Sequence, residues 1–446
     1  MTGLPAGWAR AKLIEIVQVL DSQRQPVNTT ERLARLERSP AAVRYPYFGA
    51  NGQAGVIDDY LFDEDLILLG EDGVPFLDPM KSKAYRVRGR SWVNNHAHVL
   101  RARLTIADWR YVCFALNAVD YDDIVTGSTR LKLTQEAMRR IALPVAPIKE
   151  QMRIADKLDK LLARVDACQE RLEIAKGLLR DFRTAVLHSA VTGVLSAAWR
   201  DNHHSSAWTD CVVGDMGAVS GGLTKNARRE SMQLKRPYLR VANVHASRLE
   251  LEDVAQIGGT EDEFNKTRLE VGDLLIVEGN GSLGQVGRVA MWRGELPDCS
   301  HQNHLIRWRA GPDMLPKFVM YWLMSPIGRQ ALMDRASSSS GLHTLSISKV
   351  RSVPISIPAL AEQAEIVRRV EALFTWTEAA ESRLAIAAMQ VSNLPGAVLA
   401  KAFRGELVPQ DPSDEPAQAM LDRLRAATSS SPGAAPKPRA RRVAPA

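Results

Sequence analysis

One stretch of this chain occurs twice, 212 positions apart. Residues 150–195 align with residues 362–407 without a gap, and 15 of the 46 aligned pairs are identical. The identities include both ends of the stretch, where Glu150-Gln151 matches Glu362-Gln363. An ungapped copy of this length indicates an internal duplication. The chain is therefore expected to fold into an architecture that contains one structural unit twice.

The repeated stretch has the apolar spacing of a long helix. In the first copy, apolar residues recur at alternating steps of four and three from Ile154 to Val186, with charged residues at most positions between them. This is an a/d seam, which an isolated helix would leave exposed to water. We therefore expect the two copies to pack as an antiparallel coiled coil; about 32 residues of helix would span roughly 48 Å. The alternatives are two unconnected core helices or a coiled coil between subunits.

The second copy keeps this seam from Ile366 to Val398 but contains a proline. Residues 394–396 are Leu-Pro-Gly, where the first copy has Phe-Arg-Thr at residues 182–184. A proline inside a helix costs roughly 3 kcal/mol, because it removes a donor and clashes with the preceding turn. We expect a kink at Pro395, or a break into a short terminal helix.

The composition is typical of a globular protein. Of 446 residues, 45% are hydrophobic and 24% are charged, and this length predicts two to four folded units. No apolar run approaches the length of a membrane span, and no signal peptide is recognised. The net charge of +7 weakly favours a polyanionic partner. The four cysteines have no C-x-x-C spacing, which predicts reduced thiols and a cytoplasmic location: Cys113, Cys168, Cys211 and Cys299.

A globular segment precedes each copy of the repeat, and the two segments share a framework. The first is expected to hold strands at residues 13–20, 45–49, 66–69 and 141–144, a polar surface loop or short helix at 21–44, and a helix at 109–116. The second is expected to hold strands at residues 211–213, 272–277 and 353–355 and a helix at 318–323. In this comparison residues 301–307 match residues 95–101. Beyond residue 412 the chain is rich in Ser, Pro, Ala and Arg, which predicts a disordered basic tail.

Motifs of catalytic chemistry are weak or missing. Residues 279–284 fit G-x-G-x-x-G, but a dinucleotide fold needs a helix to follow, and residues 285–292 have the pattern of a strand. His96 and His98 are two apart without a third ligand nearby, which disfavours a zinc site. There is no P-loop, no assignable nucleophile triad and no N-P-P-Y motif. The chain is therefore predicted to bind and not to catalyse.

Polar residues on Gly-rich turns are the candidates for binding. Asn, Gln and Arg can pair bidentately with base edges, and Lys and Arg hold phosphates. Two such segments joined by a rigid spacer suit a polymer read at two separated places, although loops of this kind can also be plain polar surface. The predicted DNA-binding residues are Asn51, Gln53, Asn94, Asn95 and His96 in the first segment, and Lys225, Arg228, Arg229, Arg240, Asn243, Asn280, Ser282, His301, Gln302 and Asn303 in the second.

Several of these stretches resemble one known family. Residues 45–53 (YPYFGANGQ), 69–73 (LGEDG) and 92–98 (WVNNHAH) are similar to target-recognition motifs of the specificity subunit of type I restriction-modification systems. Residues 362–371 and 399–407 resemble the spacer helices of that family. The resemblance extends from about Gly7 to Leu407 in the order recognition domain, helix, recognition domain, helix. A coiled-coil scaffold with two protein-binding heads is the main alternative, and an enzyme with an unrecognised site is a third.

The resemblance implies a fold of the α+β class, with two mixed α/β target-recognition domains separated by two long helices that form an antiparallel coiled coil. Each domain would read one half of a bipartite, asymmetric DNA target. The helices would set the spacing and dock two modification subunits, through residues that include Glu150, Gln151, Glu362, Gln363 and Arg404. S-adenosylmethionine, ATP and Mg would belong to the modification and restriction subunits, so no cofactor, metal or catalytic residue is expected in this chain.

The implied domain boundaries follow the repeat. The first recognition domain is expected at residues 1–147 and the first spacer helix at 148–200. The second domain is expected at 201–359, the second helix at 360–411 and the basic tail at 412–446.

Overall fold

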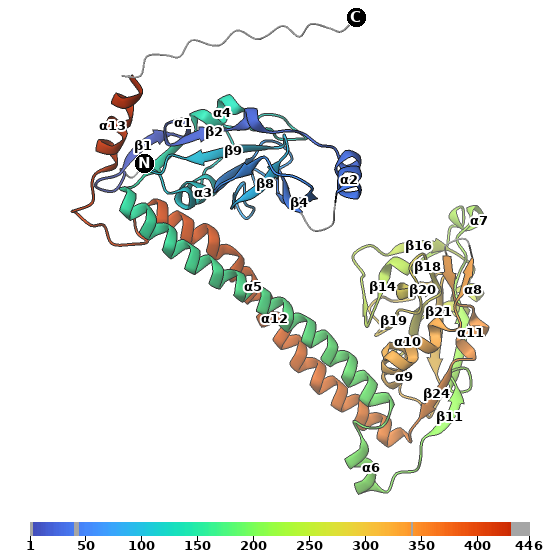
Figure 1. The fold of residues 1–446 in the computed structure, drawn as a ribbon. Coiled ribbons are helices and arrows are strands. Elements are labelled where there is room, and N and C mark those ends of the chain that lie inside the picture. The colour runs from blue at the N-terminus through green and yellow to red at the C-terminus, as the bar shows by residue number, and fades with distance from the viewer. Residues whose placement is uncertain (1–2, 40–43, 340–341, 430–446) are drawn as a thin grey trace, which may run out of the picture. The chain divides into compact units, whose positions relative to one another are not determined.

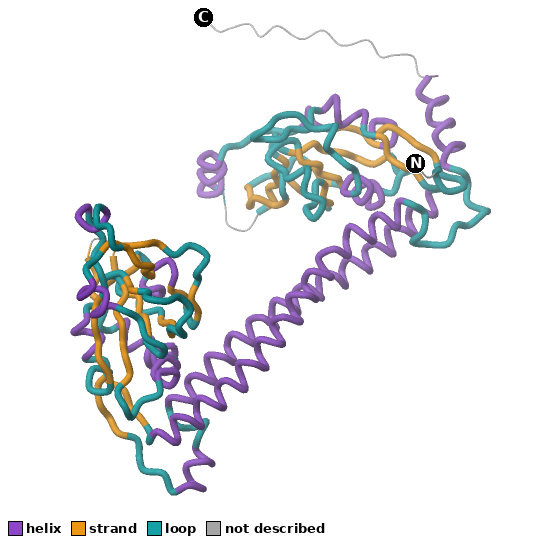
Figure 2. The backbone as a smooth tube through the Cα atoms, turned by 180° about the vertical axis from the view of Figure 1, so that it is seen from behind, coloured by secondary structure: helices purple, strands orange, loops and turns teal. Residues whose placement is uncertain are grey.

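A computed structural model describes residues 3–39, 44–339 and 342–429. The chain divides into two compact units. Unit 1 comprises Met1–Leu172 and Ile386–Ala446, and unit 2 comprises Glu173–Ala385. Each unit contains one globular head and a part of both long helices (Figure 1, Figure 2).

The head of unit 1 is built on two four-stranded sheets. The first has the order β2-β9-β6-β7 with antiparallel neighbours, and the second has the order β4-β3-β8-β5 with a parallel pair, β3 and β8, at its centre. A separate antiparallel pair joins β1 to β10. The strands are β1 (Ala9–Lys12), β2 (Val17–Val19), β3 (Tyr45–Gly49), β4 (Gly52–Ile57), β5 (Phe62–Asp63), β6 (Leu66–Gly70), β7 (Ala84–Val87), β8 (Arg90–Val93), β9 (Ala97–Ala102) and β10 (Ala142–Val145).

Short helices complete this head. They are α1 (Leu13–Ile16), η1 (Asp21–Gln23), α2 (Thr29–Arg38), α3 (Trp109–Asn117) and α4 (Gln135–Arg140). Asp108 caps the start of helix α3, and its carboxylate accepts hydrogen bonds from the first-turn amides of Arg110 and Tyr111. All five residues of β6 are buried, because the strand is covered on both faces.

The head of unit 2 repeats the framework of the first. Its main sheet has the order β12-β21-β17-β19, and β13 again lies parallel to a short strand, β20, in the sheet β16-β13-β20. Smaller pairings are β11 with β24, β14 with β15, and β18-β23-β22. The strands are β11 (Thr209–Val212), β12 (Gly217–Gly221), β13 (Lys235–Leu239), β14 (Val244–His245), β15 (Arg248–Leu249), β16 (Ala255–Gly258), β17 (Leu274–Val277), β18 (Gly279–Asn280), β19 (Val289–Met291), β20 (Ser300–His301), β21 (Leu305–Ala310), β22 (Ser337–Ser339), β23 (Leu342–Thr344) and β24 (Pro354–Ile357).

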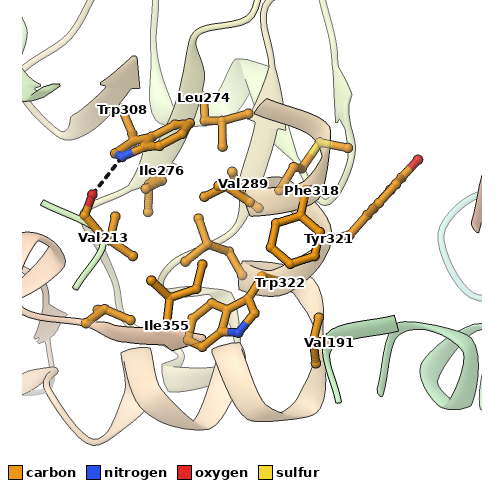
Figure 3. Close-up of a cluster of buried hydrophobic side chains, with 14 of the residues drawn as sticks. Val191, Val213, Leu274, Ile276, Val289, Trp308, Phe318, Tyr321, Trp322 and Ile355 are labelled. Atoms are coloured by element: carbon orange, nitrogen blue, oxygen red, sulfur yellow. Dashed lines mark hydrogen bonds between the residues drawn. The ribbon is translucent and has the colours of Figure 1, made fainter. Parts of the chain in front are cut away.

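Unit 2 also contains short helices. They are α6 (Ala197–His203), α7 (Ala227–Glu230), η2 (Val241–Asn243), α8 (Glu261–Thr267), η3 (Leu283–Gln285), α9 (Pro316–Met324), α10 (Pro326–Met333) and α11 (Ile347–Arg351). The core lies between α9 and the main sheet, around the buried Trp308 (Figure 3). The Trp308 indole Nε1 donates to the carbonyl oxygen of Val213 over 3.0 Å, so this buried donor is satisfied.

The two long helices are α5 (Ile148–Val191) and α12 (Leu360–Phe403), and they lie side by side in both views. In unit 1, Leu158 near the start of α5 packs in one cluster with Ala402 near the end of α12. In unit 2, Val186 near the end of α5 packs with Val370 of α12. The helices are therefore antiparallel, which confirms the predicted fold class of two mixed domains with a coiled coil.

Some details of the seam differ from the prediction. Leu158 and Val165 are buried, as the a/d spacing requires, but Cys168 is exposed. Helix α12 passes through Pro395 without a break, so the predicted short terminal helix is wrong. The turn after the proline packs through Val398 and Phe403 against the head of unit 1. We attribute the continuity of the helix to this packing, which opposes the cost of the missing hydrogen bond.

Two further predictions of secondary structure are corrected, one near the start of the chain and one in its C-terminal segment. Residues 13–20 are not one strand, because α1 occupies their first half. The predicted disordered tail contains α13 (Ala417–Ser429), whose Ala417, Met420 and Leu421 are buried against the core of unit 1. Apolar residues at helical spacing stabilise this helix within a polar segment. The remainder of the predicted tail, residues 430–446, lies outside the described residues.

Candidate nucleic-acid interface

Loops of the first head form a recess of about 370 Å³. It brings together four of the predicted DNA-binding residues, namely Asn51, Gln53, Asn94 and His96. The recess lies where the β3–β4 turn meets the loops that follow β6 and β8. Its complete lining is Gly49, Ala50, Asn51, Gly52, Gln53, Ala54, Asp72, Gly73, Asn94, His96 and Arg130.

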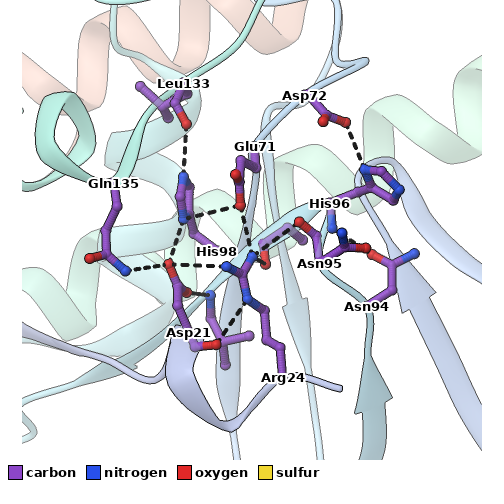
Figure 4. Close-up of polar contacts among 12 residues, drawn as sticks. Asp21, Arg24, Glu71, Asp72, Asn94, Asn95, His96, His98, Leu133 and Gln135 are labelled. Atoms are coloured by element: carbon purple, nitrogen blue, oxygen red, sulfur yellow. Dashed lines mark hydrogen bonds and ion pairs between the residues drawn. The ribbon is translucent and has the colours of Figure 1, made fainter. Parts of the chain in front are cut away.

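Local hydrogen bonds hold these side chains in place and leave part of each available. The Asn51 side-chain amide donates to the carbonyl of Gly73 over 3.1 Å, and the Gln53 amide donates to the carbonyl of Gly55 over 3.1 Å. The Asn94 side-chain oxygen accepts from the backbone N–H of His96 over 2.9 Å (Figure 4). In each case one group of the side-chain amide is used. The other can pair with a base edge.

Asp72 fixes two of the side chains that line the recess. Its Oδ1 accepts from His96 Nδ1 at 2.9 Å and from Arg130 Nη2 at 2.8 Å. Partial burial raises the pKa of Asp72, but the bonds from Arg130 and His96 outweigh it and hold the pKa below the usual value. Asp72 is therefore an ionised acceptor that fixes two donors at the mouth of the recess.

Arg130 is a residue that sequence reasoning missed. It lies 58 positions from Asp72, in a loop that returns to the recess through bridges from Lys132 to Asp72 and to Thr126. Its side chain is 65% exposed, whereas that of Asp72 is 19% exposed. Nothing near Arg130 in the sequence marks it, because its place depends on the path of the whole loop.

His98 has a structural role. Its side chain is 1% exposed, and its Nδ1 and Nε2 bond to Asp21 at 2.7 Å and to the carbonyl of Leu133 at 2.9 Å (Figure 4). Arg24 braces the same corner by donating to Glu71 and to the carbonyl of Asn95. Asn95 itself is exposed beside the recess. Within the described residues, no group of three or more His, Cys, Asp or Glu side chains could hold a metal ion.

In the second head, two of the predicted residues are buried. His301 is 0% exposed, and burial together with Arg307 lowers its pKa to about 4. Asn243 is 4% exposed and donates to the carbonyls of Glu250 and Asp253. Both side chains serve the interior of the head, and neither is exposed for the predicted contact with DNA.

Three of the predicted arginines and lysines have acidic neighbours. Arg229 forms two bonds with Glu263, at 2.8 and 3.1 Å, and this pairing lowers the pKa of Glu263 to about 2. Arg240 pairs with Asp253 at 2.8 Å, and Lys225 pairs with Glu230 at 3.3 Å.

Most of the other predicted residues of this head lie in loops or short helices. Arg228 and Ser282 are exposed, Gln302 and Asn303 are half-buried, and Asn280 lies in β18. A contact with DNA remains a prediction for all of these residues, and for the three paired ones.

Backbone hydrogen bonds show which loop residues correspond in the two heads. In each head the backbone N–H of the first residue after the short parallel strand, β8 or β20, donates to a carbonyl of the strand beside it. The backbone N–H of the first residue after β6 or β17 donates to the carbonyl of a histidine. The matching bonds are Asn94 N to Phe48 O and Gln302 N to Leu239 O, then Glu71 N to His96 O and Glu278 N to His304 O. Residues 94–96 therefore correspond to residues 302–304.

This correspondence corrects the sequence comparison by two positions. The comparison matched residues 301–307 with 95–101, which made His301 the counterpart of Asn95 and left His304 opposite the buried His98. A shift of two keeps every residue of a strand on the same face, so the apolar pattern could not reveal the error. The exposed His304 is the counterpart of His96.

The predicted partner-binding pair of the first repeat is buried inside unit 1. Glu150 is 1% exposed, and its Oε1 accepts from the indole Nε1 of Trp8 over 3.1 Å. Burial raises the pKa of Glu150, although the bond from Trp8 and the charge of Arg153 oppose this. Gln151 is 0% exposed and donates to the carbonyls of Ile106 and Ala146.

The second repeat makes a matching set of hydrogen bonds in unit 2, and we call the Trp–Glu bond of each unit the clamp. Glu362 Oε1 accepts from Trp208 Nε1 at 3.1 Å, from Arg200 Nε at 2.9 Å and from Ser196 Oγ at 2.7 Å. Gln363 donates to the carbonyl of Pro358 over 3.0 Å. All four Glu and Gln residues fasten a head to its helix, and none of them is exposed for the predicted contact with a partner. Arg404 is exposed and pairs with Glu406, and its role remains a prediction.

The helices of unit 2 carry an exposed apolar stripe, and one of its residues, Phe182, was expected in the buried seam. It consists of Ile174, Leu178 and Phe182 on α5 and Trp376 on α12, which are 55%, 63%, 37% and 59% exposed. The α5 residues are four apart and therefore lie on one face. Phe182 and Trp376 meet edge to face, with ring centroids 5.7 Å apart. Apolar surface of this kind is typical of a protein-binding face.

No helix among the described residues combines the length and the apolar character required to cross a membrane.

Comparisons with known proteins agree with this geometry. The family model of the type I restriction modification DNA specificity domain matches residues 6–175 and 205–386. The chain is 35% identical over 308 residues to the type I restriction enzyme EcoKI specificity subunit of Escherichia coli (strain K12), covering 66% of this chain and 65% of that relative. It is 33% identical over 296 residues to the StySPI specificity subunit of Salmonella potsdam, covering 64% of each. These two matches span slightly less than two thirds of the relatives' own length.

A more distant relative and two solved structures cover nearly the whole chain. The type I restriction enzyme EcoDI specificity subunit of Escherichia coli is 24% identical over 457 residues, covering 96% of this chain and 97% of that relative. A chain solved in work on complex assembly and conformational transition of the type I R-M system has a TM-score of 0.59 at 16% identity, covering 91% of this chain and 100% of that one. The HsdS subunit from Thermoanaerobacter tengcongensis has a TM-score of 0.52 at 16% identity, covering 91% and 98%. The two structures show the same fold, and the match of the family model to both heads shows that the chain belongs to the type I restriction-modification DNA specificity family.

Proposed function

We propose that this chain is the DNA-recognition subunit of a type I restriction-modification complex and that each head reads one half of a bipartite double-stranded DNA target. The observation that carries the proposal is the recess of the first head. There Asn51, Gln53, Asn94, His96 and Arg130 converge with part of their hydrogen-bonding capacity unused. Side chains of these types recognise base edges in the major groove.

Repetition of the framework supports reading at two places. The second head presents Gln302, Asn303 and His304 at the positions that Asn94, Asn95 and His96 occupy in the first. The two sets differ in sequence, which is what an asymmetric target requires. On this proposal residues 1–147 and 201–359 are the recognition domains, and the helices within residues 148–200 and 360–411 set the distance between the two half-sites.

We further propose that the exposed stripe of Ile174, Leu178, Phe182 and Trp376 docks a modification subunit. An exposed apolar face that carries two aromatic residues in contact is suited to a protein partner and not to DNA. Adenine methylation with S-adenosylmethionine, and DNA translocation with ATP and Mg, would be activities of the modification and restriction subunits. This chain would contribute recognition and spacing without catalysis.

The experiment that tests recognition is a salt series. The full chain, co-purified with its modification subunits, is titrated with duplexes that carry the target found by mapping methylated adenines in the source genome. Phosphate-driven binding predicts a log–log slope of about −0.9 per phosphate contact, so roughly six contacts give a slope near −5. A scrambled duplex serves as the control. Binding that is insensitive to both salt and sequence would contradict DNA recognition and favour a protein scaffold.

A further inference from the structure

Each head holds an exposed histidine whose Nδ1 is bound by an acid. His96 Nδ1 lies 2.9 Å from Asp72 Oδ1, and His304 Nδ1 lies 2.9 Å from Glu278 Oε2. The histidine side chains are 42% and 57% exposed, whereas Asp72 and Glu278 are 19% and 29% exposed. In both pairs the acid lies deeper than the imidazole.

The two histidines occupy the same position in the framework, but their acids do not. The carbonyls of His96 and His304 accept the matching bonds from Glu71 and Glu278, so Glu278 corresponds to Glu71. The acid that binds His96 is the next residue, Asp72. The two heads thus place an acid against the corresponding histidine from different sequence positions. Duplication of the chain alone would have kept the acid at one position, so the arrangement indicates that the histidine–acid pair itself is required.

The acid determines which hydrogen bond the imidazole offers outward. An ionised carboxylate only accepts, so Nδ1 must carry the hydrogen that it donates. In the neutral ring Nε2 then has a free lone pair and acts as an acceptor. In the DNA major groove, the groups that an acceptor can bind are the amino group on N6 of adenine and the amino group on N4 of cytosine.

We propose that His96 and His304 are corresponding specificity residues, each of which accepts a hydrogen bond at Nε2 from the exocyclic amino group of an adenine or cytosine in its own half-site. Asp72 and Glu278 are positioning residues that select this tautomer. The inference rests on the proposed function, because it requires that the heads bind DNA. The two histidines nearest to them in sequence do not qualify, because His98 uses both ring nitrogens internally and His301 is buried.

The test is a double-mutant cycle, in which a change in the protein is combined with a change in one base of the target and the affinity is measured. Each adenine of the target is replaced in turn by deoxynebularine, which lacks the 6-amino group, and each cytosine by the 2-pyrimidinone nucleoside, which lacks the 4-amino group. The wild-type chain with its modification subunits should lose roughly tenfold in affinity at one position per half-site, the size expected for one hydrogen bond. His304→Phe should weaken binding to the natural target by a similar factor and show no further loss with the analogue at that position. His96→Phe should behave in the same way in the other half-site.

Two further variants separate positioning from folding. The side-chain amide of Glu278→Gln can donate to Nδ1, so the imidazole is no longer held in the tautomer that has an acceptor at Nε2. This variant should reduce discrimination only at the base that His304 reads. His304→Gln retains an acceptor near the place of Nε2 and should retain part of the discrimination. His245→Phe is the matched control: His245 also faces an acid, Glu250 at 3.6 Å, but lies in the β14–β15 hairpin and should leave every duplex unchanged.

Each remaining outcome overturns the inference. Equal discrimination in His304→Phe and the wild type would exclude base reading by His304. A uniform loss for all duplexes with a shallower salt slope would make the residue a phosphate contact. In both of these outcomes the proposed function survives, provided that the wild-type complex binds its target with the salt dependence expected for phosphate contacts. If the wild type does not bind DNA, the proposed function itself fails.

Discussion

The indole N–H of Trp208 and the carboxylate of Glu362 meet at 3.1 Å, which is also the distance between Trp8 and Glu150 in the other unit. Each tryptophan lies at the start of a head and each glutamate in the first turn of the helix that leaves it. The duplication has therefore kept an internal fastening and not a surface. The side chain of Glu362 is 0% exposed, whereas that of Arg200 is 27% exposed, so the carboxylate is the buried centre of this fastening.

Replacing Glu362 with alanine should lower the free energy of unfolding of unit 2. The substitution leaves the donors of Trp208, Arg200 and Ser196 without their acceptor, and loss of a buried partner of this kind costs about 3 kcal/mol. Chemical denaturation followed by tryptophan fluorescence would measure the loss. Glu378→Ala is the control, because Glu378 is 65% exposed and lies 3.7 Å from Arg183. Similar stability of the two variants would contradict the clamp.

The stability of unit 2 should depend on pH through His301. Burial, and then the charge of Arg307, lower its pKa to about 4 in the folded state, against 6.5 ordinarily. The unfolded state therefore binds more protons between these values, and stability should fall as the pH falls from about 6.5 towards 4, by at most about 3 kcal/mol. His301→Asn should flatten this part of the stability profile. The exposed His188→Asn should keep the wild-type slope, and a flat wild-type profile would refute the prediction.

Pro395 should be a site where α12 can be stabilised. Pro395→Ala restores a backbone donor inside the helix and should raise the free energy of unfolding of unit 1 by about 1–3 kcal/mol. Gly396→Ala provides a positive control, since its new Cβ would have no atom within 4 Å and should add about 0.5–1 kcal/mol. Thermal melts would compare the variants. Destabilisation by Pro395→Ala alone would mean that the fold requires a distortion at the proline.

A charge in the exposed stripe should impair assembly without unfolding the chain. Leu178→Glu and Trp376→Glu each place a carboxylate on a face that we propose to be buried by the modification subunit, and should weaken association roughly tenfold or more. Light scattering after size-exclusion chromatography would report the stoichiometry. Val271→Glu changes a residue that is 76% exposed on the head and serves as the control. Intact assembly of both stripe variants would exclude this docking face.

The sequence by itself determined the features that depend on short-range pattern. The duplication, the seam from Ile154 to Val186, the buried strand at residues 66–69 and the helix at 109–116 follow from repetition and apolar spacing. The structure contains them, except that Cys168 and Phe182 of the seam are exposed. Four residues of the first recess were also named from their types and turns. Periodicity specifies which face of an element is buried, so these features need no knowledge of distant contacts.

Only the tertiary structure decided which polar residues are buried and which are exposed. Glu150 has a partner 142 positions away in Trp8, and Arg130 reaches the recess only because its loop returns to Asp72. His304 became the counterpart of His96 through backbone bonds that a two-residue slip in the sequence comparison had hidden. Burial and pairing depend on contacts between residues far apart in the chain. One sequence reports the type of each side chain but not the neighbours that determine its role.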